Sequence, residues 1–186
     1  ALDKLCPHFH LSLQSGCADT LKRMNRRYTP QQYQEVCNCL RQQFPDCALT
    51  TDVMVGFPGE DENEFLQSKE FVSSIGFARV HVFSYSKRPG TPAAKAANQV
   101  TPEQKALRSK LMTEACDKSR DNYFDKQIGR EFDVLLETQT KQGFEGYTLQ
   151  YIPVRIHTDN QSLSSGQTHR VKITDHRDGV CLAKLY

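Results

Sequence analysis

The stretch HFHLSLQSGCADTLKRMNRRYT, residues 8–29, alternates apolar and polar residues, turns at Gln14-Ser15-Gly16 and continues as a basic segment. The alternation predicts a strand over 8–13, and the residues after the turn predict a short helix near 18–26. A polar residue at a strand end can reach a ligand, and a glycine lets the chain turn closely past it. The stretch is therefore either one wall of a binding site or an ordinary strand-to-helix turn.

Two more helix-strand pairs follow this opening. Thr29 and Pro30 are typical of the N-cap and first residue of a helix, which is predicted over 30–43. ALTTDVMV (48–55) predicts a second strand, an acidic run then opens another helix, and ARVHVFSY (78–85) predicts a third strand. Strands separated by helices of this length indicate parallel pairing through right-handed crossovers.

Three loops stand at the carboxyl ends of these strands: QSGC (14–17), GFPGE (56–60) and SKRPGTP (86–92). Ligands of parallel sheets bind at the carboxyl ends of the strands, so we expect the three loops to share one cleft. Three strands cannot close a barrel, and the predicted sheet is one arc of a larger one.

The last third of the chain changes pattern. SKRPGTPAAKAANQV reads as a loop, and Thr101-Pro102 then predict a long helix to about Lys126. Its apolar stripe is predicted at Leu107, Leu111, Ala115, Tyr123 and Phe124. From Ile128 onward, short alternating runs separated by KQG, DNQSLSSG (159–166) and RDG predict antiparallel strands. Their number and spacing are typical of a small OB-like barrel, a fold that often binds oligonucleotides.

Composition restricts the function classes. The net charge of +2 neither requires nor excludes a nucleic acid, and no run of eighteen apolar residues or secretory signal is present, so the expected setting is cytoplasmic with no membrane partner. The seven cysteines show no C-x-x-C spacing, so we expect reduced thiols, several of them buried, rather than disulfides or a zinc site. The start at Ala1 suggests a portion of a longer protein.

Basic and aromatic side chains cluster near the three loops, and each cluster has two interpretations. The basic residues are either a solvated surface or a rim that contacts phosphates. His81, Phe83 and Tyr85 share one face of the third strand, where they either stack on a planar base or belong to the core. Backbone amides of the GFPGE loop could hold an anion or a carboxylate, although a Gly-x-x-Gly loop alone is a weak signal.

Taken together, HLSLQSGCADTLKRMNRRYT (10–29), TTDVMVGFPGE (50–60) and VHVFSYSKRPGTPAA (80–94) resemble the successive signatures of the radical S-adenosylmethionine methylthiotransferases. The tail resembles the TRAM domain, a small RNA-binding β-barrel. The resemblance implies an α/β fold: the second half of a partial (β/α)6 barrel over residues 1–127, followed by a TRAM-like, OB-like antiparallel barrel over residues 128–186.

Within that family, the chain most resembles the branch that adds a methylthio group to C2 of threonylcarbamoyladenosine beside the tRNA anticodon. Sister branches act on isopentenyladenosine of tRNA or on an aspartate of a ribosomal protein, and the sequence is also compatible with a non-catalytic RNA-binding module. The resemblance implies tRNA, S-adenosylmethionine, two [4Fe-4S] clusters and an electron donor that reduces a cluster.

The cluster motif C-x-x-x-C-x-x-C is absent, so we assign no metal ligand and no catalytic residue to this chain, and expect it to be inactive alone. By position in the family's motifs, the cofactor-binding candidates are Gln14, Ser15, Asp52, Val55, Gly56, Phe83 and Tyr85. The RNA-binding candidates are Lys22, Arg23, Arg26, Arg27, Lys87, Arg88, Tyr147 and Arg170. Arg26 could instead serve the cofactor carboxylate.

Overall fold

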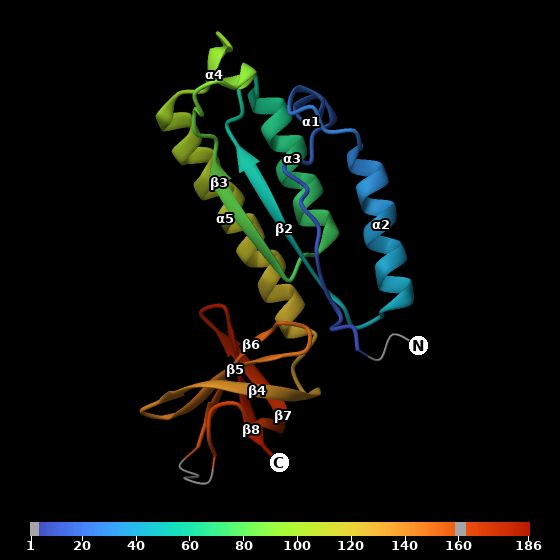
Figure 1. Ribbon diagram of the computed structural model, residues 1–186, viewed down its shortest axis with the longest axis vertical. Coiled ribbons are helices and arrows are strands. Elements are labelled where there is room, and N and C mark those ends of the chain that lie inside the picture. Colours follow the sequence, from blue (N-terminus) through green and yellow to red (C-terminus); the bar gives the residue numbers. More distant parts are fainter. Residues whose placement is uncertain (1–3, 159–162) are drawn as a thin grey trace. The chain divides into compact units, whose positions relative to one another are not determined.

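The computed structural model describes residues 4–158 and 163–186 of the chain. It divides into two compact units. The sheet unit comprises His10–Pro45 and Leu49–Ser119, and the barrel unit comprises Arg120–Tyr186 with Asp46–Ala48 and the residues before His10. The strands form a three-stranded sheet and a closed five-stranded barrel (Figure 1), so the fold is mixed α/β.

The elements agree with most of the sequence predictions. The helices are α1 (Ala18–Arg23), α2 (Pro30–Gln43), α3 (Glu62–Ile75), α4 (Pro92–Lys95) and α5 (Pro102–Asp125). The strands are β1 (His8–His10), β2 (Ala48–Val55), β3 (Arg79–Ser84), β4 (Glu131–Thr140), β5 (Gly143–Thr148), β6 (Pro153–His157), β7 (Thr168–Arg177) and β8 (Val180–Leu185). The predicted loop after β3 contains α4, one helical turn that Thr91 caps.

The three-stranded sheet has the order β1-β2-β3, and β2 and β3 run parallel and side by side (Figure 1). Their register places Asp52 opposite His81 and Met54 opposite Phe83. Val53 and Val55 of β2 are buried, whereas Asp52 and Met54 between them are partly exposed. The alternation follows from the pleat, which turns successive side chains to opposite faces. The predicted parallel pairing is therefore confirmed.

The first strand is shorter than the predicted 8–13, because side chains replace part of the backbone ladder after His10. The Tyr33 hydroxyl donates to the Leu11 carbonyl at 2.7 Å, and the Tyr28 hydroxyl lies 2.8 Å from the Leu13 carbonyl. The Leu13 amide donates to Thr51 Oγ1. Buried backbone groups require partners, and here tyrosine and threonine hydroxyls supply them where strand geometry does not.

The helices begin where the sequence signals indicate. Thr29 caps α2 and Asp61 caps α3, each in a capping box with the residue three positions on. The predicted stripe of α5 is confirmed at Phe124, which is buried, and at Tyr123, which packs against the core. It is wrong at Leu107, which is 57% exposed while the neighbouring Arg108 is buried. A buried arginine displaces the inward face from the position that apolar residues alone predict.

Each unit has its own apolar interior. In the sheet unit, Tyr33 of α2 packs against Phe71 of α3 and against Phe77, with ring centroids 6.3–6.4 Å apart. The buried cluster of the barrel unit consists of Phe124, Phe132, Val134, Leu136, Phe144, Ile152, Val154, Ile156, Leu163, Val171, Ile173, Cys181 and Ala183. These alternate residues point inward from the strands, as expected for a small barrel filled by side chains.

The barrel has the strand order β4-β5-β6-β8-β7 and departs from the prediction in two ways. The pair β6-β8 is parallel, whereas the tail was expected to be antiparallel throughout. The run FEGYTLQYIPVRIHT is split into β5 and β6 by a tight loop, in which the Tyr151 amide donates to the Thr148 carbonyl at 2.9 Å. Of the predicted divider 159–166, residues 159–162 lie outside the described part.

All seven cysteines are described, and none forms a disulfide, as expected. Five are buried, whereas Cys6 and Cys39 are exposed. Burial raises the pKa of the Cys116 and Cys181 thiols to about 12, so both stay protonated near neutral pH. Within residues 4–158 and 163–186, no helix is long and apolar enough to cross a membrane.

Gly16 provides a test of the packing between the first turn and α3. A Cβ atom on Gly16 would lie 2.7 Å from Phe71 Cβ and 2.8 Å from the Ser68 carbonyl oxygen. Because the latter is helix backbone, the contact cannot relax cheaply, and we expect Gly16→Ala to lower the free energy of unfolding by about 1–3 kcal/mol. Urea denaturation measures the loss. Ser12→Ala, at an exposed side chain, is the control, and equal midpoints for the two variants would refute the packing role.

Candidate functional site

The carboxyl ends of the three strands lie side by side, as predicted. The Gln14 amide donates to the Asp52 carbonyl at 2.8 Å, and the Met54 amide donates to the Gln14 carbonyl at 2.8 Å. On the other side of β2, the Tyr85 amide donates to the Val55 carbonyl at 2.9 Å. Residues from three distant parts of the sequence therefore meet at one edge of the sheet.

Gln14 stands at this edge in a strained conformation. Its φ of +69° lies in the left-handed region, which a non-glycine residue seldom adopts. The two hydrogen bonds to β2 hold it there. Residues kept in such conformations cluster at functional sites, where the surrounding structure compensates for the strain. The side chain is partly exposed and remains a candidate for ligand contact.

Ser15 and Gly16, in contrast, face the interior. Ser15 is fully buried, and its hydroxyl accepts from the Cys17 amide at 3.1 Å and lies 3.4 Å from Ser68 Oγ. The Gly16 amide donates to Ser68 Oγ at 2.8 Å. The close approach that Gly16 permits is thus to α3, not to a ligand. The predicted role of Ser15 in cofactor binding stays a prediction.

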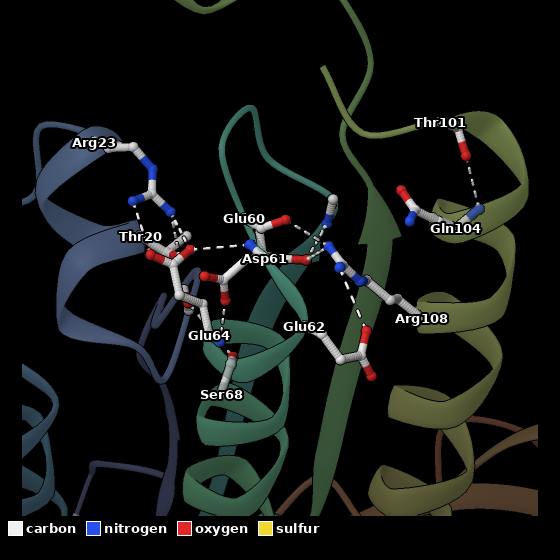
Figure 2. Close-up of polar contacts among 12 residues, drawn as sticks. Thr20, Arg23, Glu60, Asp61, Glu62, Glu64, Ser68, Thr101, Gln104 and Arg108 are labelled. Atoms are coloured by element: carbon white, nitrogen blue, oxygen red, sulfur yellow. Dashed lines mark hydrogen bonds and ion pairs between the residues drawn. The ribbon is translucent and has the colours of Figure 1, made fainter. Parts of the chain in front are cut away.

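Glu60 is the buried acidic residue of the GFPGE loop (Figure 2). Its Oε1 accepts from the Gly56 amide at 2.8 Å and from Arg108 Nη1 at 2.9 Å, and Arg108 Nη1 also donates to the Glu60 carbonyl. Burial raises the pKa of the Glu60 carboxyl, and the bonds to Gly56 and Arg108 oppose that rise. The pair fastens the loop after β2 to α5.

Glu64 forms a second connection on the other side of α3 (Figure 2). Its carboxylate forms an ion pair with Arg23 of α1, and Thr20 Oγ1 donates to it at 3.2 Å. This hydrogen-bonded pairing raises the pKa of the Arg23 guanidinium. The Glu64 amide, in turn, donates to Asp61 Oδ1 at 2.8 Å. The first turn of α3 therefore holds α1 as well as α5.

Of the two groups that the GFPGE loop was expected to hold, an anion or a carboxylate, these contacts show a carboxylate of the chain itself. The Gly56 and Glu64 amides are bonded to the chain's own carboxylates, those of Glu60 and Asp61. Glu62 adds another negative charge on the same turn. Amides that already donate to a carboxylate are not available to an anion, and the neighbouring carboxylates repel it.

Tyr85 lies beyond the end of β3 and is 8% exposed. Its ring packs edge-to-face on Phe57 with centroids 5.3 Å apart, and Lys105 Nζ lies 5.1 Å above it. The hydroxyl oxygen is buried and has no hydrogen-bond partner among the described residues. A buried hydroxyl without a partner is costly, so the atom is a direct indication of a missing polar group.

Asp52 faces the opposite side of the sheet from the buried valines. His10 Nε2 lies 3.3 Å from its Oδ2, and His10 Nδ1 lies 3.1 Å from Thr50 Oγ1. His81, its register partner, has its ring 6.3 Å from that of His10. No group of three or more histidine, cysteine, aspartate or glutamate residues in the described part is placed to hold a metal ion.

The remaining cofactor candidates differ in accessibility. Val55 is buried and contributes its carbonyl to the Tyr85 amide. Gly56 has a φ of +71°, and a Cβ atom there would lie 2.5 Å from the Lys105 side chain. Phe83 is 41% exposed at the end of β3, so its ring is available to a planar ligand. The predicted role of these residues in cofactor binding stays a prediction.

The basic RNA-binding candidates of the sheet unit fall into two groups. Arg23 is committed to Glu64 through their ion pair. The exposed ones are Lys22, Arg26, Arg27, Lys87 and Arg88. The first three follow the turn at Gln14 and the last two follow β3, so they belong to loops that meet at the same edge. A guanidinium that is already paired contributes less to phosphate binding than an exposed one.

In the barrel unit, Arg170 is also paired. Its guanidinium lies 3.2 Å from Asp133 Oδ2 and 3.5 Å from Glu131 Oε2. Tyr147 is partly buried and stacks on Tyr151, with ring centroids 4.7 Å apart. Both predicted RNA contacts remain predictions, and the pairing of Arg170 weakens its case.

Sequence reasoning missed Arg108, which pairs with Glu60, and Lys105, which lies above the Tyr85 ring. The spacing of α5 predicted an apolar stripe, and nothing in it indicated that a buried arginine meets Glu60 some fifty residues away. Two signals were present in the sequence: an acidic residue directly after Gly-Phe-Pro-Gly, and an arginine at a core-compatible helical position. Charge complementarity between them could have suggested the pair.

Because the ion pair between Glu60 and Arg108 is buried, we predict that replacing Arg108 lowers the stability of the fold by an amount that depends on pH. Their side chains are 2% and 5% exposed, so Arg108→Met should lower the free energy of unfolding by about 3–5 kcal/mol near pH 8. Without the arginine, the pKa of Glu60 rises further. A carboxyl whose pKa is raised by folding favours the folded state at low pH, and this contribution is lost as pH rises through the folded pKa. The deficit should therefore shrink toward about pH 5.

Urea denaturation at the two pH values measures this deficit. Glu62→Gln is the matched control, because Glu62 lies 3.5 Å from Arg108 Nη2 but is 69% exposed, so its loss should cost less than about 1 kcal/mol. The double variant Glu60→Gln/Arg108→Met should recover most of the loss. An equal deficit at both pH values would contradict the assignment.

Comparison with known proteins agrees with this arrangement. A model of the radical SAM superfamily matches residues 1–72. The threonylcarbamoyladenosine tRNA methylthiotransferase MtaB of Thermotoga maritima is 40% identical over 150 residues, which are 80% of this chain and 35% of that protein. MtaB of Bacillus subtilis is 37% identical over 157 residues, which are 82% of this chain and 35% of that protein.

A second type of relative matches to a similar degree. The tRNA-2-methylthio-N6-dimethylallyladenosine synthase of Acetivibrio thermocellus is 38% identical over 146 residues, which are 78% of this chain and 30% of that protein. The chain spans about a third of the length of these relatives. With the matched superfamily model at its start and methylthiotransferases aligned over about four fifths of its length, the chain belongs to the radical SAM methylthiotransferase family.

Proposed function

We propose that this chain is part of a tRNA-modifying enzyme that adds a methylthio group to C2 of threonylcarbamoyladenosine next to the anticodon. The observation that carries the proposal is the 40% identity, over 80% of the chain, to a relative named for that substrate. The aligned length is too great for a single shared motif. The choice of nucleoside rests on the relatives alone, because no described contact distinguishes one modified adenosine from another.

The architecture supports a division of labour between two domains. We assign residues 1–127 to the second half of a partial (β/α)6 radical SAM barrel, in keeping with the parallel sheet and its crossover helices. We assign residues 128–186 to a TRAM-like domain, in keeping with the closed five-stranded barrel. Small barrels of this size commonly bind nucleic acid.

S-adenosylmethionine is the cofactor that the edge of the sheet would hold. The buried, unpartnered Tyr85 hydroxyl fits a ligand that supplies a polar group, and the exposed Phe83 ring fits a planar base. Gln14, in its strained conformation, would contact the ligand from the neighbouring strand end. S-adenosylmethionine, when bound beside an iron-sulfur cluster, supplies the radical that removes hydrogen from the base.

The two [4Fe-4S] clusters do not fit the described residues of this chain. Five of the seven cysteines are buried, and no described group of three or more possible ligands is placed around one point. We therefore place the cluster ligands, and the contact with the electron donor, outside this chain. On this view the 186 residues alone bind S-adenosylmethionine and tRNA, but they do not complete the reaction.

The tRNA would contact the exposed cations beside the strand ends and the barrel. Lys22, Arg26 and Arg27 lie after the first strand end, and Lys87 and Arg88 after the third. Phosphate contacts of this kind position an RNA without reading its sequence. We also propose that the protein is cytoplasmic, because its proposed substrate, tRNA, is modified in the cytoplasm.

A second candidate function is the sister activity on isopentenyladenosine of tRNA. It is favoured by the 38% identity to a synthase named for dimethylallyladenosine. The sequence motifs are also compatible with action on a ribosomal aspartate and with a non-catalytic RNA-binding role.

Nucleoside analysis of tRNA tests the proposed reaction. The complete gene product, expressed in cells that lack their own methylthiotransferases, should convert threonylcarbamoyladenosine to its 2-methylthio derivative, detected by mass spectrometry of digested tRNA. The 186-residue chain alone should give no product. Methylthiolation of isopentenyladenosine instead would establish the sister activity, and no modified nucleoside of either kind would overturn the proposal.

The unpartnered hydroxyl of Tyr85 gives a sharper test of cofactor binding. Tyr85→Phe keeps the ring against Phe57 and removes only an oxygen that bonds to nothing described. We expect unchanged or slightly higher thermal stability, since a buried unsatisfied group is removed, and about 5- to 10-fold weaker binding of S-adenosylmethionine by the complete gene product. Calorimetric titration measures the affinity. Tyr28→Phe, whose hydroxyl bonds to backbone carbonyls, is the control and should lose stability instead. Unchanged affinity in Tyr85→Phe would remove Tyr85 from the site.

A further inference from the structure

One face of β3 carries polar side chains that are open to solvent. Arg79, His81 and Phe83 are alternate residues of this strand and are exposed, whereas the two valines between them are partly buried. Alternate residues of a strand project from the same face. β3 is an outer strand of the three-stranded sheet, with β2 beside it. This polar face leads up to the strand end at Tyr85, where we place the cofactor.

The two histidines on this side of the sheet differ in their availability. The rings of His10 and His81 lie with centroids 6.3 Å apart. Both ring nitrogens of His10 are engaged, since Nδ1 lies 3.1 Å from Thr50 Oγ1 and Nε2 lies 3.3 Å from Asp52 Oδ2. The ring nitrogens of His81 form no hydrogen bond or ion pair with any described residue. Asp52 is thus already paired with His10, and the His81 ring can still donate to a ligand.

A cavity of about 340 Å³ lies beside the same strand. Its lining consists of residues from β3 and α5: Arg79, Val80, His81, Val82, Phe83, Thr113, Cys116 and Asp117. The volume is at the lower end of the range of small-molecule pockets. Arg79 forms no ion pair with a described residue, so the β3 wall carries an uncompensated positive charge, whereas Asp117 places a negative charge on the α5 wall. The anionic end of a ligand would therefore be held against β3.

The candidate nucleosides differ in the polarity of the group on N6. The threonylcarbamoyl group carries a carboxylate, a hydroxyl and a urea carbonyl, whereas the isopentenyl group is a hydrocarbon. A site that is built to donate hydrogen bonds discriminates strongly against a group that cannot accept them, because its own polar groups would lose water without a replacement. A face with Arg79 and His81 therefore fits the threonylcarbamoyl group and disfavours the isopentenyl group.

The spacing along β3 suits a base held near the strand end. His81 precedes Phe83 by two residues, which is about 7 Å along an extended strand. The base reacts at C2 but carries its substituent on N6, so the substituent can extend along the strand while C2 stays near the cofactor. A threonine joined through a urea is about as long as two extended residues, and it spans this distance.

We propose that His81, with Arg79 beside it, determines the choice of nucleoside by binding the threonylcarbamoyl group of the substrate. The inference rests on the proposed function for the presence of that substrate, and it adds the residues that distinguish it from isopentenyladenosine. The His81 ring donates an N–H to a carboxylate oxygen, and Arg79 adds positive charge. Neither side chain contacts the reacting C2 atom, so both are specificity residues rather than catalytic ones.

Binding of anticodon stem-loop RNA tests this role without requiring the reaction. The complete gene product is titrated with two stem-loops that differ only in the threonylcarbamoyl group on the adenosine, and fluorescence anisotropy gives the ratio of their dissociation constants. The wild type should bind the modified RNA more tightly. His81→Phe, which keeps a ring but has no N–H, should reduce this preference about 10-fold. His81→Gln, which keeps an N–H donor, should retain most of it.

His157→Phe is the matched control, because His157 is an exposed histidine at the end of β6. It should leave the ratio of the two dissociation constants unchanged. The ratio is decisive because phosphate contacts contribute equally to both RNAs and cancel. Since His81 is exposed, the melting temperature of His81→Phe should stay within a few degrees of the wild type.

Nucleoside analysis in cells provides a second measurement. Among the tRNA products of the complete gene product, His81→Phe should lower the ratio of methylthiolated threonylcarbamoyladenosine to methylthiolated isopentenyladenosine by about the same factor of 10. His81→Gln and His157→Phe should keep the ratio of the wild type.

Three outcomes overturn the role of His81: equal binding of the two RNAs by the wild type, the same preference in His81→Phe as in the wild type, or a loss in His81→Gln as large as that in His81→Phe. The last outcome would indicate a general disturbance of the strand. Failure of the proposed function is distinguishable, because it is decided by the nucleoside that the wild-type gene product modifies. Modification of isopentenyladenosine alone by the wild type would remove both proposals, whereas an unchanged preference in His81→Phe removes only this one.

Discussion

The arrangement of the sheet unit depends on one buried carboxylate. Glu60 joins the Gly56 amide of its own loop to Arg108 of α5, and both charged side chains are almost completely excluded from water. A charge in that position requires a partner, because an isolated one would be far more costly than the pair. The loop after β2 therefore cannot move without α5. Glu64, one turn further, fixes α1 in the same way through Arg23.

This network explains what the edge of the sheet can bind. The Gly56, Asp61 and Glu64 amides around the start of α3 are bonded to carboxylates of the chain itself, so we expect ligand contacts from residues on either side of it. Those residues are Gln14, in a left-handed conformation, and Tyr85, with a buried hydroxyl that lacks a partner among the described residues. The polar network is rigid, and the two unsatisfied or strained features beside it are where a ligand would add most.

The sequence by itself determined the local elements. Thr29-Pro30 predicted the start of α2, ALTTDVMV predicted β2 to the residue, and the motifs predicted the family. Only the tertiary structure decided which polar groups meet. Arg108 is buried against Glu60, Arg170 is paired, and Tyr151 stacks on His8. Hydrophobic periodicity and capping act within a few residues, so they are visible in the sequence. Pairing of charges and rings depends on distances between segments far apart in the chain, and only the folded backbone sets those distances.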